Sequence, residues 1–118
     1  MLSFTSTQVG AIGEAQFREH VIAHMEENYP GAGEKLRAPT GRATLEKVIA
    51  DARSYGLEAE LDLVYYIIVA WTMGVDFHIK LPAFQEILTS KALTPSKKAD
   101  AIQKLCRAIL QTLEDSKQ

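Results

Sequence analysis

Disulfide bonds and export signals are both lacking in this sequence. Cys106 is the only cysteine among 118 residues, so no disulfide can form within the chain. A single free thiol is typical of proteins from reducing compartments. The chain starts with Met1-Leu2-Ser3, and neither a basic cluster nor an apolar segment follows that would predict a signal peptide. These absences favour a cytoplasmic location.

Long apolar runs and an excess of positive charge are lacking as well. The longest apolar stretch, Leu61 to Met73, is interrupted by Asp62 and Thr72, and it is shorter than the ~20 residues that cross a bilayer. With 13 Lys and Arg against 15 Asp and Glu, the formal charge of −2 gives no attraction to nucleic acid or anionic lipid. We therefore expect neither a membrane nor a nucleic acid as a partner.

The composition is that of an ordinary globular protein. Hydrophobic residues make up 47% of the chain and charged residues 24%, which is enough apolar surface to form a core. No repeat, low-complexity segment or linker divides the chain. The sequence therefore predicts a single helical domain over residues 1–118.

Apolar residues recur at helical spacing between clusters of glycine and proline. The spacing predicts four main helices, over about 6–28, 41–54, 58–73 and 95–114, and a short helix over 82–88. The third of these is apolar nearly all round from Leu63 to Trp71, as is typical of a central helix, and we expect Trp71 and at least one of Tyr65 and Tyr66 in the core. The predicted fold is all-α, a compact bundle of four main helices plus one short helix, with the third main helix central.

Local signals mark several helix ends. Thr5 and Gln8 have the spacing of a capping box, and Thr94 followed by Pro95 is typical of an N-cap and first helical position. Gly56 suits the left-handed position that ends a helix.

Chemistry-bearing residues are sparse, and the sequence predicts no catalytic, cofactor-binding or metal site. His20 and His24 share one helix face and could hold a zinc ion, but the Glu that a metalloprotease needs after the first His is missing. A metal-dependent enzyme using His20, His24 and a nearby Glu is the alternative. Cys106 lies within an apolar stripe, where an inert buried thiol is expected.

The segment 74–82 has two interpretations. In one, a loop held by the helices presents residues to a partner protein. The candidate contact residues are Asp76, Phe77, His78 and Lys80, with Tyr29 and the loop 30–33 as a second choice. In the other, the apolar side chains of Phe77, Ile79 and Leu81 close the end of the bundle while Asp76 accepts hydrogen bonds from backbone N–H groups.

The order of several short motifs resembles a group of small helical proteins found in proteobacteria and myxobacteria. The motifs are FREHVIAHMEENYP (17–30), YGLEAELD (55–62), GVDF (74–77), Leu81-Pro82 and Ile87-Leu88. Genes for such proteins often lie beside those for type VI secretion components or their effectors. The resemblance implies an accessory role toward a secreted effector or a secretion tip component.

These observations together predict a non-catalytic protein that binds another protein. It could act as an adaptor or chaperone that loads the effector, or as an immunity protein that blocks it. A homodimer is the structural alternative, since a second copy could cover the highly apolar third helix.

Overall fold

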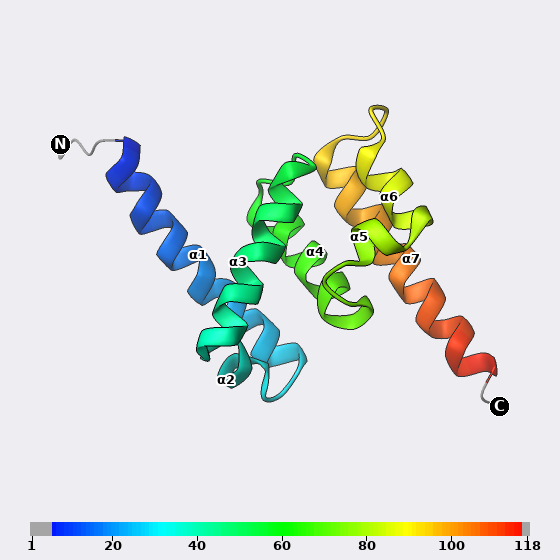
Figure 1. Ribbon diagram of the computed structural model, residues 1–118, viewed down its shortest axis with the longest axis horizontal. Coiled ribbons are helices and arrows are strands. Elements are labelled where there is room, and N and C mark those ends of the chain that lie inside the picture. Colours follow the sequence, from blue (N-terminus) through cyan, green and yellow to red (C-terminus); the bar gives the residue numbers. More distant parts are fainter. Residues whose placement is uncertain (1–5, 117–118) are drawn as a thin grey trace. The chain divides into compact units, whose positions relative to one another are not determined.

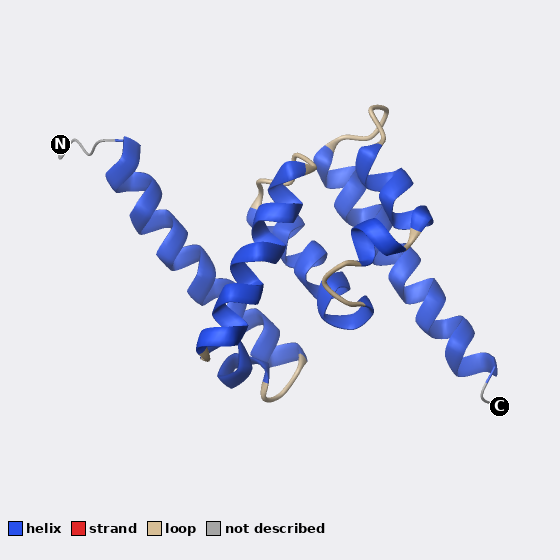
Figure 2. Ribbon diagram, viewed as in Figure 1, coloured by secondary structure: helices blue, strands red, loops and turns tan. Residues whose placement is uncertain are grey.

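The computed structural model describes residues 6–116, and their side chains from Gly13 onward. Seven helices and no strand occur in this part of the chain (Figures 1 and 2). They are α1 (Ser6–Asn28), α2 (Ala32–Arg37), α3 (Pro39–Ser54), α4 (Glu60–Met73), α5 (Phe77–Lys80), α6 (Pro82–Thr89) and α7 (Pro95–Ser116). The all-helical prediction is confirmed. The predicted capping box at Thr5 and Gln8 lies outside the described side chains.

The four predicted main helices correspond to α1, α3, α4 and α7, and the predicted short helix to α6. Their bounds differ from the predicted ones by no more than two residues. The structure adds α2 and α5, which lie in segments where glycine and proline predict loops. Each is a helix of six residues or fewer, too short to show an apolar period in the sequence.

Residue contacts cluster into two units, 1–42 and 43–118, and α3 begins in the first and continues in the second. Within the first unit α1 packs against α2. The buried side chains of these two helices are Val21, Ile22, Met25, Ala32 and Leu36. The Glu26 carboxylate accepts hydrogen bonds from the backbone N–H groups of Gly31 (2.8 Å) and Gly33 (3.2 Å), which fixes the turn into α2.

Gly41, in the first turn of α3, lies against the end of α2. A Cβ atom at this position would overlap the backbone carbonyl oxygen of Lys35. Only glycine therefore permits this approach of the two helix backbones, since a carbonyl group cannot move aside as a flexible side chain can.

In the second unit, α4 packs against α7 and α5, and α6 packs against α5 and α7. Half of the residues of α4 are buried, a larger share than in the longer helices α3 and α7 of this unit, in accord with its apolar sequence. The aromatic rings of Tyr66, Phe77 and Phe84 form a chain of contacts from α4 through α5 to α6, with centroid separations of 4.9 and 5.2 Å.

The prediction that Trp71 lies in the core is wrong, because 37% of its surface is exposed. A helix that is apolar all round has more apolar surface than its neighbours cover, and Trp71 lies on the uncovered side. The prediction for one of the two tyrosines is confirmed, since Tyr66 is fully buried.

The helix-end predictions hold in the second unit. The Thr94 hydroxyl accepts a hydrogen bond from the backbone N–H of Lys97 at 3.3 Å, as an N-cap does. Gly56 has φ +91°, and the backbone N–H groups of Gly56 and Leu57 donate to the carbonyls of Arg53 and Ala52 in a Schellman motif. Within residues 6–116, no helix combines the length and hydrophobicity that crossing a membrane requires.

Candidate functional site

The predicted contact segment is a one-turn helix, α5, that is half inside the protein. Phe77 and His78 are buried, whereas Asp76 and Lys80 reach the surface and 61% of Ile79 is exposed. The interpretation in which Phe77 and Ile79 both close the end of the bundle is therefore correct for Phe77 and wrong for Ile79. A single turn of helix directs successive side chains to different sides, so residues 77 and 79 cannot both point inward.

Asp76 pairs with lysine side chains, and it makes no side-chain cap hydrogen bond. Its carboxylate lies 3.6 Å from the Lys47 ammonium and 4.0 Å from that of Lys80. The Lys47 ammonium also donates a hydrogen bond to Asp51 at 3.0 Å. Asp51 foremost, with Asp76 adding to it, raises the pKa of Lys47 above its ordinary value. Lys47 therefore stays positively charged between the two carboxylates, one on α3 and one beside α5.

His78 connects α5 to the end of α3. Its Nδ1 lies 2.7 Å from the Tyr55 hydroxyl, a hydrogen-bond distance, and its Nε2 lies 3.3 Å from an oxygen of Asp51. The second contact is close enough for electrostatic attraction but is not aligned as a hydrogen bond. The sequence analysis did not single out Lys47, Asp51 and Tyr55 as a group. These residues follow one another at intervals of four, and this spacing places all three on one side of α3 and its terminal turn.

Tyr55 and Tyr66, whose rings lie near that of His78, both favour the neutral form of the phenol. Burial, and secondarily the charge of Asp51, raises the pKa of Tyr55. The same two causes in the same order raise the pKa of Tyr66 strongly. The Tyr66 hydroxyl is buried and finds no hydrogen-bond partner among the described residues. Next to His78 the structure thus places two neutral phenols and the ion pair of Lys47 with Asp51.

A carboxylate, an imidazole and a hydroxyl in one row could in principle relay a proton. Here both ring nitrogens of His78 face protein groups, and only 7% of its side chain is exposed. The row of Asp51, His78 and Tyr55 connects α5 to the end of α3.

A hollow of about 220 Å³ lies on the outer side of the same segment. It is lined by Met73, Gly74, Val75, Asp76, Phe77, Lys80 and Leu81. The walls are mostly apolar, and Asp76 and Lys80 supply one charge of each sign. Among the lining residues, Phe77 is buried, and its ring packs against those of Tyr66 and Phe84.

The other predicted candidates lie in the first unit. Tyr29 is half-buried in the turn between α1 and α2 and is not part of the hollow. His20 is exposed and His24 half-buried, both on α1. Among residues 6–116, no three side chains of His, Cys, Asp or Glu are grouped as a metal site requires. A third ligand from the described part of the chain therefore does not join His20 and His24.

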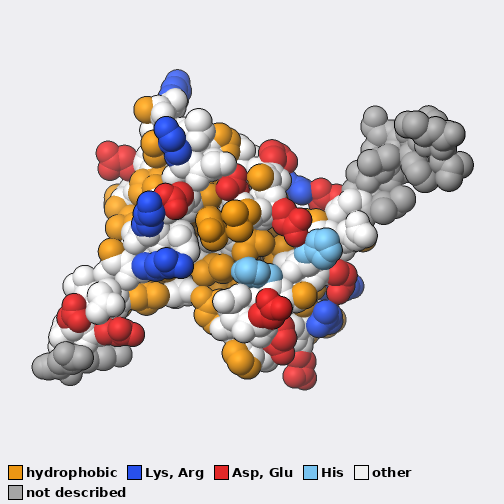
Figure 3. Space-filling model, turned by 180° about the vertical axis from the view of Figure 1, so that it is seen from behind, with side chains coloured by type: hydrophobic (Ala, Val, Ile, Leu, Met, Phe, Trp, Pro, Cys, Tyr) orange, Lys and Arg blue, Asp and Glu red, His pale blue; other side chains and the backbone are white. Residues whose placement is uncertain are grey.

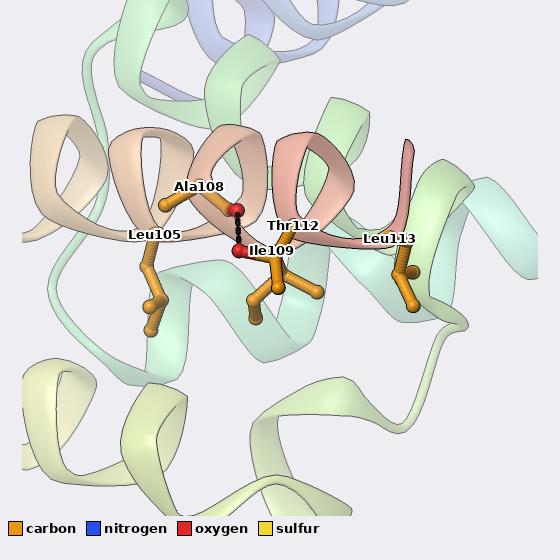
Figure 4. A pocket seen from close by; sticks show the side chains of 5 residues that line it. All are labelled: Leu105, Ala108, Ile109, Thr112 and Leu113. Atoms are coloured by element: carbon orange, nitrogen blue, oxygen red, sulfur yellow. Dashed lines mark hydrogen bonds between the residues drawn. The ribbon is translucent and has the colours of Figure 1, made fainter. Parts of the chain in front are cut away.

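The second half of α7 carries further apolar side chains at the surface. Ala99, Ile102 and Cys106 of its apolar stripe are buried, but Ile109 is only half-buried, and 39% of Leu110 and 53% of Leu113 are exposed. A shallow hollow of about 350 Å³ runs along this half, and Leu105, Ile109 and Leu113 point to the same side of the helix (Figure 4). The Thr112 hydroxyl bonds back to the Ala108 carbonyl at 2.9 Å, so this polar group adds little to the hollow.

Comparison of the chain with protein-family models, with curated proteins and with solved structures finds no match.

Proposed function

We infer that the chain is a non-catalytic accessory protein that binds a secreted bacterial effector or a secretion tip component, in the cytoplasm and in the context of type VI secretion. The observation that carries this inference is the hollow beside α5, an apolar depression with Asp76 and Lys80 at its surface. An apolar pocket with charges at its edge suits an apolar anchor side chain from a partner protein. The motifs at 17–30, 55–62 and 74–77 supply the link to secretion.

The buried contacts of α5 support a binding role over a catalytic one. Phe77 and His78 hold the segment against α4 and the end of α3, which leaves Asp76 and Lys80 presented on a rigid base. A preformed surface loses little conformational freedom on binding. In this arrangement Phe77 and His78 contribute by positioning, and the direct contacts come from Val75, Asp76 and Lys80.

Co-purification with the products of neighbouring genes tests this function. We expect wild type to retain one of them at micromolar concentration. We expect Lys80→Glu to weaken retention by about tenfold, because it reverses a charge at the edge of the hollow and so disturbs electrostatic complementarity with the partner. Lys91→Glu is the matched control, since Lys91 is also exposed but lies outside the hollow. If no product is retained by wild type, or if both variants behave alike, the proposed site is wrong.

Deletion of the gene separates the two roles. An adaptor or chaperone is required for effector secretion, whereas an immunity protein is required for survival of the producing cell. If deletion changes neither secretion nor self-intoxication, the secretion context should be abandoned.

The rival metal-dependent enzyme is tested by elemental analysis of protein purified without a metal column. Stoichiometric zinc that is lost in a His20→Ala, His24→Ala variant would replace this proposal.

A further inference from the structure

The hollow beside α5 is smaller than a typical pocket for a small molecule. Its volume is about 220 Å³, whereas such pockets measure roughly 300–1,000 Å³. Part of its wall is bare backbone, because Gly74 has φ +106° and a Cβ atom at this position would meet no heavy atom within 4 Å. Glycine allows another chain to approach the backbone closely. The hollow therefore suits one side chain of a protein segment that runs along its edge.

The two charged groups at the edge of the hollow have unused hydrogen-bonding capacity. The Asp76 carboxylate lies 3.6 Å from the Lys47 ammonium and 4.0 Å from that of Lys80, so both separations are longer than a hydrogen bond. The side chains of Asp76 and Lys80 are 44% and 76% exposed. An ionised carboxylate only accepts hydrogen bonds, and an ammonium only donates them. The edge thus presents one acceptor and one donor next to each other.

The charges around this edge cancel. Lys47 and Lys80 are positive, Asp51 and Asp76 are negative, and the signs alternate from α3 to α5 at separations of 3.0, 3.6 and 4.0 Å. The whole chain has a formal charge of only −2. In Figure 3, red and blue side chains lie next to one another on the part of the surface that leads to the smaller grey group, the C-terminal residues. Electrostatic attraction therefore favours neither an acidic nor a basic partner at the hollow.

We propose that the hollow binds an uncharged, extended peptide segment of the partner protein, with one apolar side chain inside and the peptide backbone along the edge. A backbone N–H of the segment donates to Asp76, and a backbone carbonyl accepts from Lys80. This inference rests on the proposed function and adds the chemistry of the partner's contact segment.

The two edge charges select this partner over others. Docking removes water from both charges, and each then needs a hydrogen-bonding partner. A helix does not supply both groups, because its backbone N–H and carbonyl groups bond to one another. An acidic segment pairs with Lys80 but is repelled by Asp76, and a basic segment has the reverse difficulty. An extended backbone provides a donor and an acceptor without any charge.

Three blocked tripeptides test this chemistry on the purified chain: acetyl-Ala-Leu-Ala amide, acetyl-Glu-Leu-Glu amide and acetyl-Lys-Leu-Lys amide. Binding is measured from the NMR shifts of the backbone amides of residues 73–81. We expect the uncharged peptide to bind with a Kd on the order of 1 mM, because a single anchor side chain buries little surface. The two charged peptides should bind at least about threefold more weakly. Isoamyl alcohol, which carries the leucine branch without peptide groups, should also bind more weakly than the uncharged peptide.

Two matched variants test the backbone contact. Asp76→Ala removes the acceptor at the edge and should weaken binding of the uncharged peptide by about fivefold. Asp100→Ala is the control, since the Asp100 side chain is 51% exposed and also pairs with a lysine four positions later, Lys104, but lies on α7 outside the hollow. This variant should bind the peptide like wild type. Circular dichroism verifies that both variants retain their helices.

Several results would overturn the proposal. One is a charged peptide that binds as tightly as the uncharged peptide or more tightly. Others are equal binding of isoamyl alcohol and the uncharged peptide, equal effects of the two variants, or no shift of these amides at about 10 mM uncharged peptide.

Failure of this inference is distinguishable from failure of the proposed function. If a gene product is retained but the uncharged peptide does not bind, the contact chemistry is wrong and the accessory role stands. If the peptide binds but no gene product is retained, the accessory role is wrong and peptide binding at the hollow stands.

Discussion

Replacing Tyr66 by phenylalanine isolates the cost of one buried hydroxyl. The ring lies in the core of the second unit, 4.9 Å from that of Phe77, and its hydroxyl has no hydrogen-bond partner among the described residues. In the unfolded chain the same hydroxyl is hydrated. Folding therefore strips water from this group without replacing it. Tyr66→Phe keeps the ring contacts and removes the penalty.

The expected gain follows from that penalty. A buried polar group without a partner costs about 1–3 kcal/mol, and the small space left by the missing oxygen offsets part of the gain. We expect Tyr66→Phe to raise the free energy of unfolding by about 1 kcal/mol and Tm by roughly 4 °C. Most substitutions of a fully buried residue lower stability, so the sign itself is informative.

The same variant changes the response to alkaline pH. Burial, followed by the charge of Asp51, raises the pKa of Tyr66, so the folded protein keeps this phenol protonated while the unfolded chain releases its proton above about pH 10. The folded state then binds more protons than the unfolded state, and stability falls as the pH rises through about 10. Tyr66→Phe should make this fall shallower. Tyr55 and Lys47, whose pKa values are also raised, keep part of the dependence.

Urea unfolding monitored by circular dichroism at pH 7 and pH 10.5 measures both effects. Tyr65→Phe is the matched control, since Tyr65 is the neighbouring residue in α4 and only half-buried, and it should change stability by less than about 0.5 kcal/mol. Tyr55→Phe should act in the opposite direction and cost about 1–2 kcal/mol, because it removes the 2.7 Å contact with His78. A Tyr66→Phe protein that is less stable than wild type by 1 kcal/mol or more would show that the hydroxyl is well bonded, and would refute the reasoning.

Three further predictions concern other parts of the chain. Gly41→Ala should lower stability by about 1–3 kcal/mol, because the new Cβ overlaps the Lys35 carbonyl. Gly13 has open space around it, so Gly13→Ala should raise stability by up to about 1 kcal/mol. Equal effects of the two variants in thermal unfolding would argue against the close approach of α2 and α3 at Gly41. Thr94→Ala should cost about 1 kcal/mol through loss of the α7 N-cap, and no measurable loss in urea unfolding would mean that the cap is unimportant. Cys106 is buried, and burial raises the pKa of its thiol. A thiol reagent at pH 8 should therefore modify Cys106 slowly in the native protein and rapidly in urea. Equal rates of modification would show an accessible thiol.

The sequence was sufficient for the helices with a clear apolar period and for their ends. Periodicity of 3.6 residues is a local property, and so are the N-cap at Thr94 and the left-handed glycine at position 56. The short helices α2 and α5 were out of reach, because one turn of helix carries no period and is stabilised by contacts from elsewhere in the fold. The chain of contacts from Tyr66 through Phe77 to Phe84 is an example of such support.

Residue type and local pattern determined that half of α4 would be buried and that α7 would carry an apolar stripe. Only the tertiary structure decided which side of each element is covered. It exposed Trp71 and Leu113, although both belong to apolar patterns, and it buried His78 against Tyr55 and Asp51, which lie 23 and 27 positions away in the chain. The physical reason is that burial depends on which neighbours a helix meets, and the sequence of one helix specifies its apolar face but not how far another helix extends along it.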